Sequence, residues 1–136
     1  APIFKEAELG YITSGIGLAP KFADLYAEYY GEKTGLIPCA HGATSISQWL
    51  PGEVLHDNAI FQAKLAMRSS QLGGILWHQG CQDTVKEDAF EHKERTRRVF
   101  MSFRENLGEE IPIIVGALGD FVTKISNVHR IFRKTR

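Results

Sequence analysis

The sequence predicts an α/β fold with a parallel β-sheet, and two observations point to it. Stretches with apolar residues at helical spacing alternate along the 136 residues with short apolar runs of strand length. Each of those runs ends in small or polar residues, as strands do at the carboxyl edge of an open α/β sheet. Such alternation is typical of βαβ units, in which neighbouring strands run parallel.

The first half of the chain contains two predicted helices and one predicted strand. Apolar residues recur at helical spacing over residues 18–29, and a glycine follows shortly afterwards as a stop signal. A short buried strand is expected over 35–40, although its Pro38 lacks the N–H group that a strand ladder uses. A polar loop over 41–51 then leads into a second helix over 55–67.

The second half continues the alternation. A strand is predicted at Ile75 to Trp77, and a long, highly charged helix over about 85–107. The clearest strand covers residues 112–118, and apolar spacing over 121–132 indicates a closing helix. The strand, helix, strand order within this half favours parallel pairing of its two strands. His56 and His92 lie on the charged surfaces of predicted helices and are expected to be solvated.

Composition and charge exclude some classes of partner. The 16 basic residues balance the 16 acidic ones, so the whole chain indicates neither a nucleic-acid nor a membrane partner. No apolar stretch is long enough to span a bilayer, and no signal peptide is visible. Two cysteines do not make a disulfide framework. A cytoplasmic location is therefore favoured, and secretion stays open.

Small and polar residues follow every predicted strand. The strand at 75–77 is followed directly by His78 and Gln79, and the other two end at residues 41–45 and 116–120. In a doubly wound sheet such ends converge on one crevice, where glycines let the backbone approach a ligand. Backbone N–H groups and a side-chain amide are the components of an oxyanion hole. The alternative, for any one of these glycines, is a plain tight turn.

Several ordered motifs resemble a known family. Residues 35–50, 74–80 and 111–120, together with Asp83, are similar to the sialate O-acetylesterase and acetylxylan-esterase-related family of SGNH-type serine carbohydrate esterases. The resemblance covers about residues 14–120. It implies a flavodoxin-like three-layer α/β/α fold and hydrolysis of O-acetyl esters on sugars, without a metal or another cofactor.

The resemblance also implies an oxyanion hole. Gly42 matches the glycine whose backbone N–H faces the oxyanion, and Gln79 and Gly80 match the block that supplies the side-chain donor. Three positions depart from the pattern. Cys81 stands where the family has a glutamate, Gln82 where it has a serine, and Ala43 where a second glycine is usual. Loss of the glutamate removes an acceptor that orders the loop, which makes the orientation of Gln79 less certain.

Three further residues are candidates for substrate binding. His78 and Asp83 match the same family block, and Trp49 is a candidate platform for a sugar, with a lid or core role as the alternative. A thiol nucleophile or a metal site at His78, Cys81 and Asp83 is disfavoured. Residues this close on one strand and turn rarely form a triad, and zinc sites need further ligands.

The nucleophile and base of the family are not among these residues. The family's Gly-Gln-Ser-Asn and Asp-x-x-His motifs do not occur in the sequence. We therefore expect residues 1–136 to be the central part of a single SGNH-hydrolase-like domain, completed by missing segments or by a partner chain. The alternative is a non-catalytic remnant that binds acetylated sugar or nothing.

Overall fold

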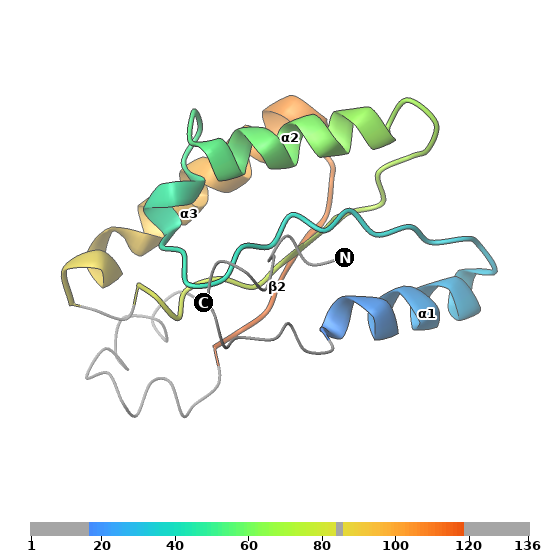
Figure 1. Cartoon of the computed structure of the whole chain (residues 1–136), viewed down its shortest axis with the longest axis horizontal. Helices are drawn as coiled ribbons and strands as arrows, with labels where there is room; N and C mark the ends of the chain where they lie inside the picture. Colours follow the sequence, from blue (N-terminus) through green and yellow to red (C-terminus); the bar gives the residue numbers. More distant parts are fainter. Residues whose placement is uncertain (1–16, 84–85, 119–136) are drawn as a thin grey trace, which may run out of the picture. The chain divides into compact units, whose positions relative to one another are not determined.

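The computed structural model describes residues 17–83 and 86–118 (Figure 1). The chain divides into two compact parts, Ala1–His41 and Gly42–Arg136. In the second part, helices and strands alternate and the strands run parallel, as the sequence predicts for an α/β fold.

The first part contains helix α1, Leu18–Tyr30. Gly31 ends it in a left-handed conformation with φ of 69°, and its N–H donates to the carbonyl of Ala27 at 2.9 Å. Glycine takes this conformation without a steric penalty, so the predicted stop is confirmed. The predicted strand over 35–40 is wrong, because these residues form no ladder with another described segment. Pro38, which lacks an N–H donor, is one physical reason.

The second part places two helices on one face of a two-stranded sheet. Helix α2 is Val54–Ala66 and helix α3 is Lys86–Leu107, and they lie side by side (Figure 1). Strands β1, Ile75–Trp77, and β2, Ile113–Val115, pair in parallel with Ile75 opposite Ile113. Helices α2 and α3 and strand β1 confirm the predictions over 55–67, 85–107 and 75–77. Strand β2 is also confirmed, although it is shorter than the predicted 112–118. The predicted helix over 121–132 lies outside the described residues.

Two further features complete the second part. A short 3₁₀ helix, η2, covers Ile46–Trp49 within the stretch predicted as a polar loop. Among the helices that the structure describes, none is both long and apolar enough to cross a membrane.

The core of the second part is built around Trp77. Its ring meets the rings of Trp49 and Phe100 edge to face, each with centroids 5.4 Å apart. Ile46 and Val99 are completely buried in the same cluster. Burying a side chain of this size stabilises a fold by about 1.5–3 kcal/mol. The cluster therefore fixes β1, η2 and α3 together at the end of the sheet where the predicted site lies.

His56 is part of this core, although the sequence predicted a solvated histidine on a charged helix surface. It is 3% exposed, and its ring stacks on Phe103 of α3 with centroids 5.2 Å apart. Its Nδ1 lies 2.8 Å from a carboxylate oxygen of Asp57, and this hydrogen bond is the main cause that lowers the pKa of Asp57. Its Nε2 is buried and has no hydrogen-bond partner among the described residues. The prediction was wrong because one turn of α2 faces α3 and not water.

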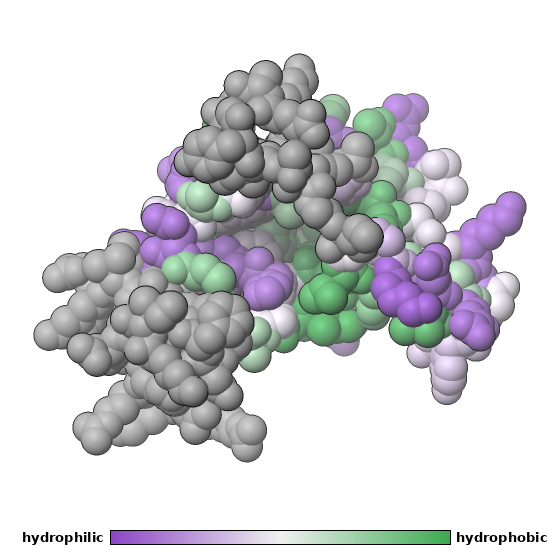
Figure 2. Space-filling view, turned by 60° about the horizontal axis from the view of Figure 1, so that its bottom comes forward, coloured by the Kyte–Doolittle hydropathy of each residue, from purple (hydrophilic) through white to green (hydrophobic). Residues whose placement is uncertain are grey.

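On the other face of the sheet, apolar side chains are exposed. Leu76 and Ile114 pair across the strands and alternate with the residues that face the helices, and they are 45% and 55% exposed. Figure 2 brings the lower side of Figure 1 forward and shows apolar side chains gathered near its centre.

Candidate functional site

The candidate site lies where β1 ends, and Asp83 is at its centre. Asp83 has no exposed surface. Its two carboxylate oxygens lie 3.1 and 3.0 Å from the backbone nitrogen of Ile46, whose N–H donates to them. Ile46 is the first residue of η2, where a helix has no internal acceptor for this N–H. Asp83 therefore ties the turn after β1 to the loop that contains Gly42.

Gln79 is held through both ends of its side-chain amide. The nitrogen donates to the carbonyl oxygen of Thr44 at 3.1 Å and to a carboxylate oxygen of Asp83. The amide oxygen lies 3.1 Å from Nε2 of His92, on α3. We call Thr44, Ile46, Gln79, Asp83 and His92 the Asp83 network. It joins the loop before η2, the turn after β1 and helix α3 by hydrogen bonds.

The imidazole of His92 belongs to this network and not to the solvated surface that the sequence predicted. Burial lowers its pKa, the positive charge of Arg95 lowers it further, and Asp83 acts in the opposite direction. A carboxylate oxygen of Asp83 lies 3.8 Å from Nε2 of His92. The two groups would form an ion pair only if the ring were protonated. A sequence signal for His92 existed, because it lies seven residues before the buried Val99, on the same face of the helix.

Trp49 is tied to the loop from the core side. Its Nε1–H donates to the hydroxyl of Thr44 at 3.0 Å, and only 6% of the residue is exposed. Of the roles that the sequence left open, this position corresponds to core packing against Trp77. A sugar could stack on Trp49 only if the ring became accessible, so that role stays a prediction.

Two turns of the site use left-handed or glycine-specific backbone. Gly80 has φ of 134°, and a Cβ added to it would lie 3.3 Å from Leu118 and 3.6 Å from Nε2 of His92. Ala43 has φ of 53°, at the position where the resemblance suggested a glycine. A residue with a Cβ is strained in this conformation. The turn beside Gly42 thus keeps a glycine-like shape although it has lost the glycine.

The other predicted residues are placed as follows. Gly42 is exposed in the turn that leads to Thr44, and His78 is exposed at the end of β1. His78 packs beside Gly116, which follows β2. A Cβ added to Gly116 would lie 3.4 Å from the imidazole ring of His78. Asp83 faces the protein interior, so direct contact with a substrate would require the network to open. The predicted roles of these residues stay predictions.

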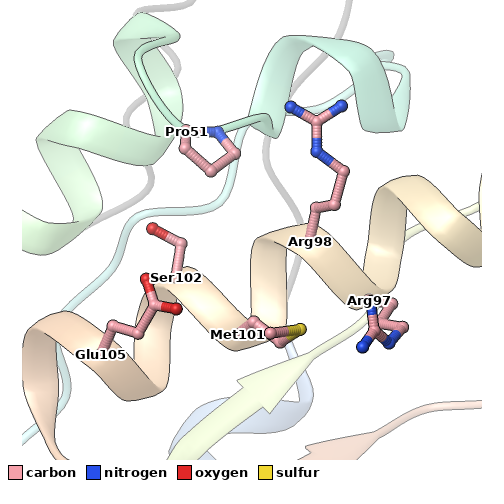
Figure 3. A pocket seen from close by; sticks show the side chains of 6 residues that line it. All are labelled: Pro51, Arg97, Arg98, Met101, Ser102 and Glu105. Carbon is pink, nitrogen blue, oxygen red and sulfur yellow. The ribbon is translucent and has the colours of Figure 1, made fainter.

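A surface hollow lies away from the predicted residues. It has a volume of about 270 Å³ between α3 and the turn after η2. Figure 3 shows arginines at one end and Ser102 with Glu105 at the other; the lining residues are Pro51, Arg97, Arg98, Met101, Ser102 and Glu105. Its charges are mixed, and Arg97 already pairs with Glu94. Within the described ranges, no cluster of three or more His, Cys, Asp or Glu residues could hold a metal ion.

Comparison with known proteins identifies the family. The model of the family described as carbohydrate esterase, sialic acid-specific acetylesterase, matches residues 1–136. The chain belongs to this family. The resemblance inferred from the motifs is therefore confirmed, and the chain is related to hydrolases that act on carbohydrate esters.

A plant relative agrees with this membership. The chain is 26% identical over 133 residues to the probable carbohydrate esterase At4g34215 of Arabidopsis thaliana, covering 91% of this chain and 51% of the relative. It also resembles the crystal structure of the Arabidopsis thaliana protein AT4G34215, with a TM-score of 0.76 at 25% identity, over 87% of this chain and 52% of that one. The chain thus spans about half the length of these relatives.

The sequence of the site differs from the pattern of the carbohydrate esterase family beside Gly80. The glutamate expected after Gly80 is replaced by Cys81, which is exposed. Its loss was expected to leave Gln79 less ordered. In the structure, Asp83 supplies an acceptor and His92 holds the other end of the same amide. The orientation of Gln79 is therefore fixed by hydrogen bonds that the family motif alone did not predict.

Proposed function

We propose that these residues form part of a serine carbohydrate O-acetylesterase of the SGNH type, with a flavodoxin-like three-layer α/β/α domain. The observation that carries the proposal is the family match along the whole chain. In this proposal the chain contributes the oxyanion hole, and the nucleophile and base come from further segments of the protein or from a partner chain. The substrate is an acetylated sugar or polysaccharide.

The proposed reaction is acyl transfer to water. A serine hydroxyl attacks the acetyl carbonyl while a base takes its proton, and the carbonyl oxygen becomes an oxyanion. The C–O bond to the sugar then breaks, and the sugar oxygen takes that proton. Water hydrolyses the acetyl-enzyme and releases acetate. Backbone N–H groups at Gly42 and Gly80 and the amide of Gln79 are the proposed donors to the oxyanion.

The hydrogen bonds of Gln79 add a requirement to this proposal. Both N–H groups of its side-chain amide already donate hydrogen bonds, one to Thr44 and one to Asp83. An oxyanion can accept from Gln79 only by replacing one of these acceptors. The oxyanion would replace the carbonyl of Thr44, because this acceptor is uncharged. A hydrogen bond from an N–H group to a carboxylate is roughly twice as strong as one to a neutral acceptor.

The first experiment measures intact mass and p-nitrophenyl acetate hydrolysis on one purified sample. Turnover that a serine-directed phosphonate abolishes, with a covalent mass increase, supports the esterase. In an active protein, Gln79→Ala should lower kcat by roughly 10²–10³-fold. Gln82→Ala, on the exposed side of the same turn, should leave kcat unchanged. Equal effects of the two substitutions would refute the proposed role of Gln79.

The alternative is a non-catalytic protein that retains the fold. The specific observation in its favour is that the block around Gln79 departs from the family pattern, with Cys81 in place of its glutamate and Gln82 in place of its serine. Without a nucleophile and its base, an oxyanion hole gives only residual rate enhancement. No phosphonate adduct and no turnover in a sample whose mass corresponds to these residues would favour this alternative.

A further inference from the structure

The orientation of the Gln79 amide can be assigned from its neighbours. Its nitrogen contacts the oxygens of Thr44 and Asp83, which are acceptors only. The end that faces His92 at 3.1 Å is therefore the amide oxygen, itself an acceptor. Nε2 of His92 must consequently carry the hydrogen of this contact.

The state of the imidazole follows from its surroundings. Burial and the nearby Arg95 lower the pKa of His92, against the opposing effect of Asp83. Both causes favour the neutral ring, and a neutral ring that donates to Gln79 has its single hydrogen on Nε2. A ring with the hydrogen on Nδ1 would place two lone pairs against each other at the Gln79 contact.

The room for this ring is provided by a glycine. A Cβ on Gly80 would lie 3.6 Å from Nε2 of His92 and 3.3 Å from Leu118. A larger side chain there would crowd the imidazole at the point where it reaches Gln79. The family resemblance places Gly80 in the oxyanion hole. Because it has no side chain, Gly80 also lets His92 of α3 reach Gln79 without a steric clash.

We infer that His92 is a positioning residue for the candidate oxyanion hole, holding the oxygen of Gln79 so that the amide nitrogen stays directed at Thr44 and Asp83. When an oxyanion replaces the carbonyl of Thr44, the bonds from His92 and to Asp83 keep the amide from rotating. This role of His92 deepens the proposed function and rests on it for the identity of the ligand. The hydrogen-bond geometry itself does not depend on turnover.

The first test is a long-range proton–nitrogen NMR spectrum of the chain with labelled histidine, recorded at neutral pH. The expected result is a neutral His92 ring with its hydrogen on Nε2. A ring protonated on Nδ1 alone would overturn the inference. This measurement needs no substitution, so it decides the question even if a variant fails to fold.

The second test compares the side-chain amide signals of Gln79 in three variants. His92→Phe should shift both signals toward those of a free glutamine, and His92→Gln, which keeps an N–H donor, should restore them. His56→Phe is the matched control, because it makes the same change at a ring that stacks on Phe103. The Ile46 backbone amide should keep its shift in all three, which shows that Asp83 still holds η2. Unchanged Gln79 signals in His92→Phe would overturn the inference.

An activity measurement separates this inference from the proposed function. If the protein hydrolyses p-nitrophenyl acetate, His92→Phe should lower kcat roughly tenfold with KM unchanged, less than loss of a donor itself. His92→Gln should recover most of kcat. No hydrolysis by the unsubstituted protein counts against the proposed function, while the NMR results still decide the role of His92. An unchanged kcat in an active His92→Phe protein would overturn it.

Discussion

Asp83 shows how one residue can fix the arrangement of a site without being exposed to a ligand. Its carboxylate accepts hydrogen bonds from the Ile46 backbone and from Gln79, and it is completely buried. Removing an acceptor from such a position leaves a buried donor unsatisfied, which costs more than an ordinary hydrogen bond contributes. The shape of the site therefore depends on the identity of this side chain.

Asp83→Asn should destabilise the chain by about 2 kcal/mol, because asparagine turns one acceptor oxygen into a donor that faces another N–H. Urea denaturation followed by circular dichroism measures the change. Asp57→Asn is the matched control: its side chain is 60% exposed, so a much smaller loss is expected. Equal losses at the two positions would contradict the anchoring role of Asp83.

Ala43 stores strain beside Gly42. Its φ of 53° costs an alanine roughly 1–2 kcal/mol, whereas glycine loses about 0.5–1 kcal/mol of chain entropy on folding. Ala43→Gly should therefore raise the free energy of unfolding by about 0.5 kcal/mol. Ala43→Val should lower it, because β-branched residues are worse in this conformation. Thermal denaturation of both variants checks this, and a more stable Ala43→Val would show that the turn is not left-handed.

At the scale of elements, the two faces of β2 differ in what they contact. Ile113 packs against the core, while the neighbouring Ile114 is 55% exposed on the other face. Ile113→Thr should cost about 2 kcal/mol, and Ile114→Thr less than about 1 kcal/mol, since it removes less buried apolar area. Urea denaturation of the pair measures both. A loss at Ile114 as large as that at Ile113 would mean that something covers the open face of the sheet.

The sequence predicted helices better than strands, and the reason is physical. A helix closes its hydrogen bonds within its own segment, so its spacing pattern and terminal glycine suffice, as at Gly31. A strand needs a neighbour for its ladder. Residues 35–40 have strand-like composition but pair with no other described segment, so the expectation failed. The strand predictions at 75–77 and 113–115 were confirmed, because each of these segments is the ladder partner of the other.

For the molecule as a whole, the sequence placed the candidate residues after a strand but did not specify their hydrogen bonds. The motifs placed Gln79 and Asp83 at the end of a strand, where the structure has them. The bond from Ile46 to Asp83 spans 37 residues, and His92 reaches Gln79 from a helix that looked solvated. Such contacts depend on how α3 and η2 pack on β1, which local patterns do not specify. The charged surroundings of His92 hid its place on the buried side of α3.

The half-buried position of His92 has a consequence for the stability of the whole chain. Its folded-state pKa is lowered below 6.5, mainly by burial. As the pH falls below about 6.5, the unfolded chain therefore takes up a proton before the folded chain does, and the free energy of unfolding decreases. The decrease ends once the pH is below the folded-state pKa. Asp57, whose pKa is lowered from 3.8, loses its contribution only at lower pH.

Urea denaturation from about pH 8 to about pH 5 should therefore show a falling stability in the unsubstituted chain. His92→Gln keeps a donor for Gln79 but cannot titrate, so its stability should fall less over the same range. Taking the difference between the two curves removes the contributions of the other histidines, which both proteins share. Parallel curves would mean that His92 has the same pKa in the folded and unfolded chains. That result would also remove the argument that burial keeps its ring neutral against Gln79.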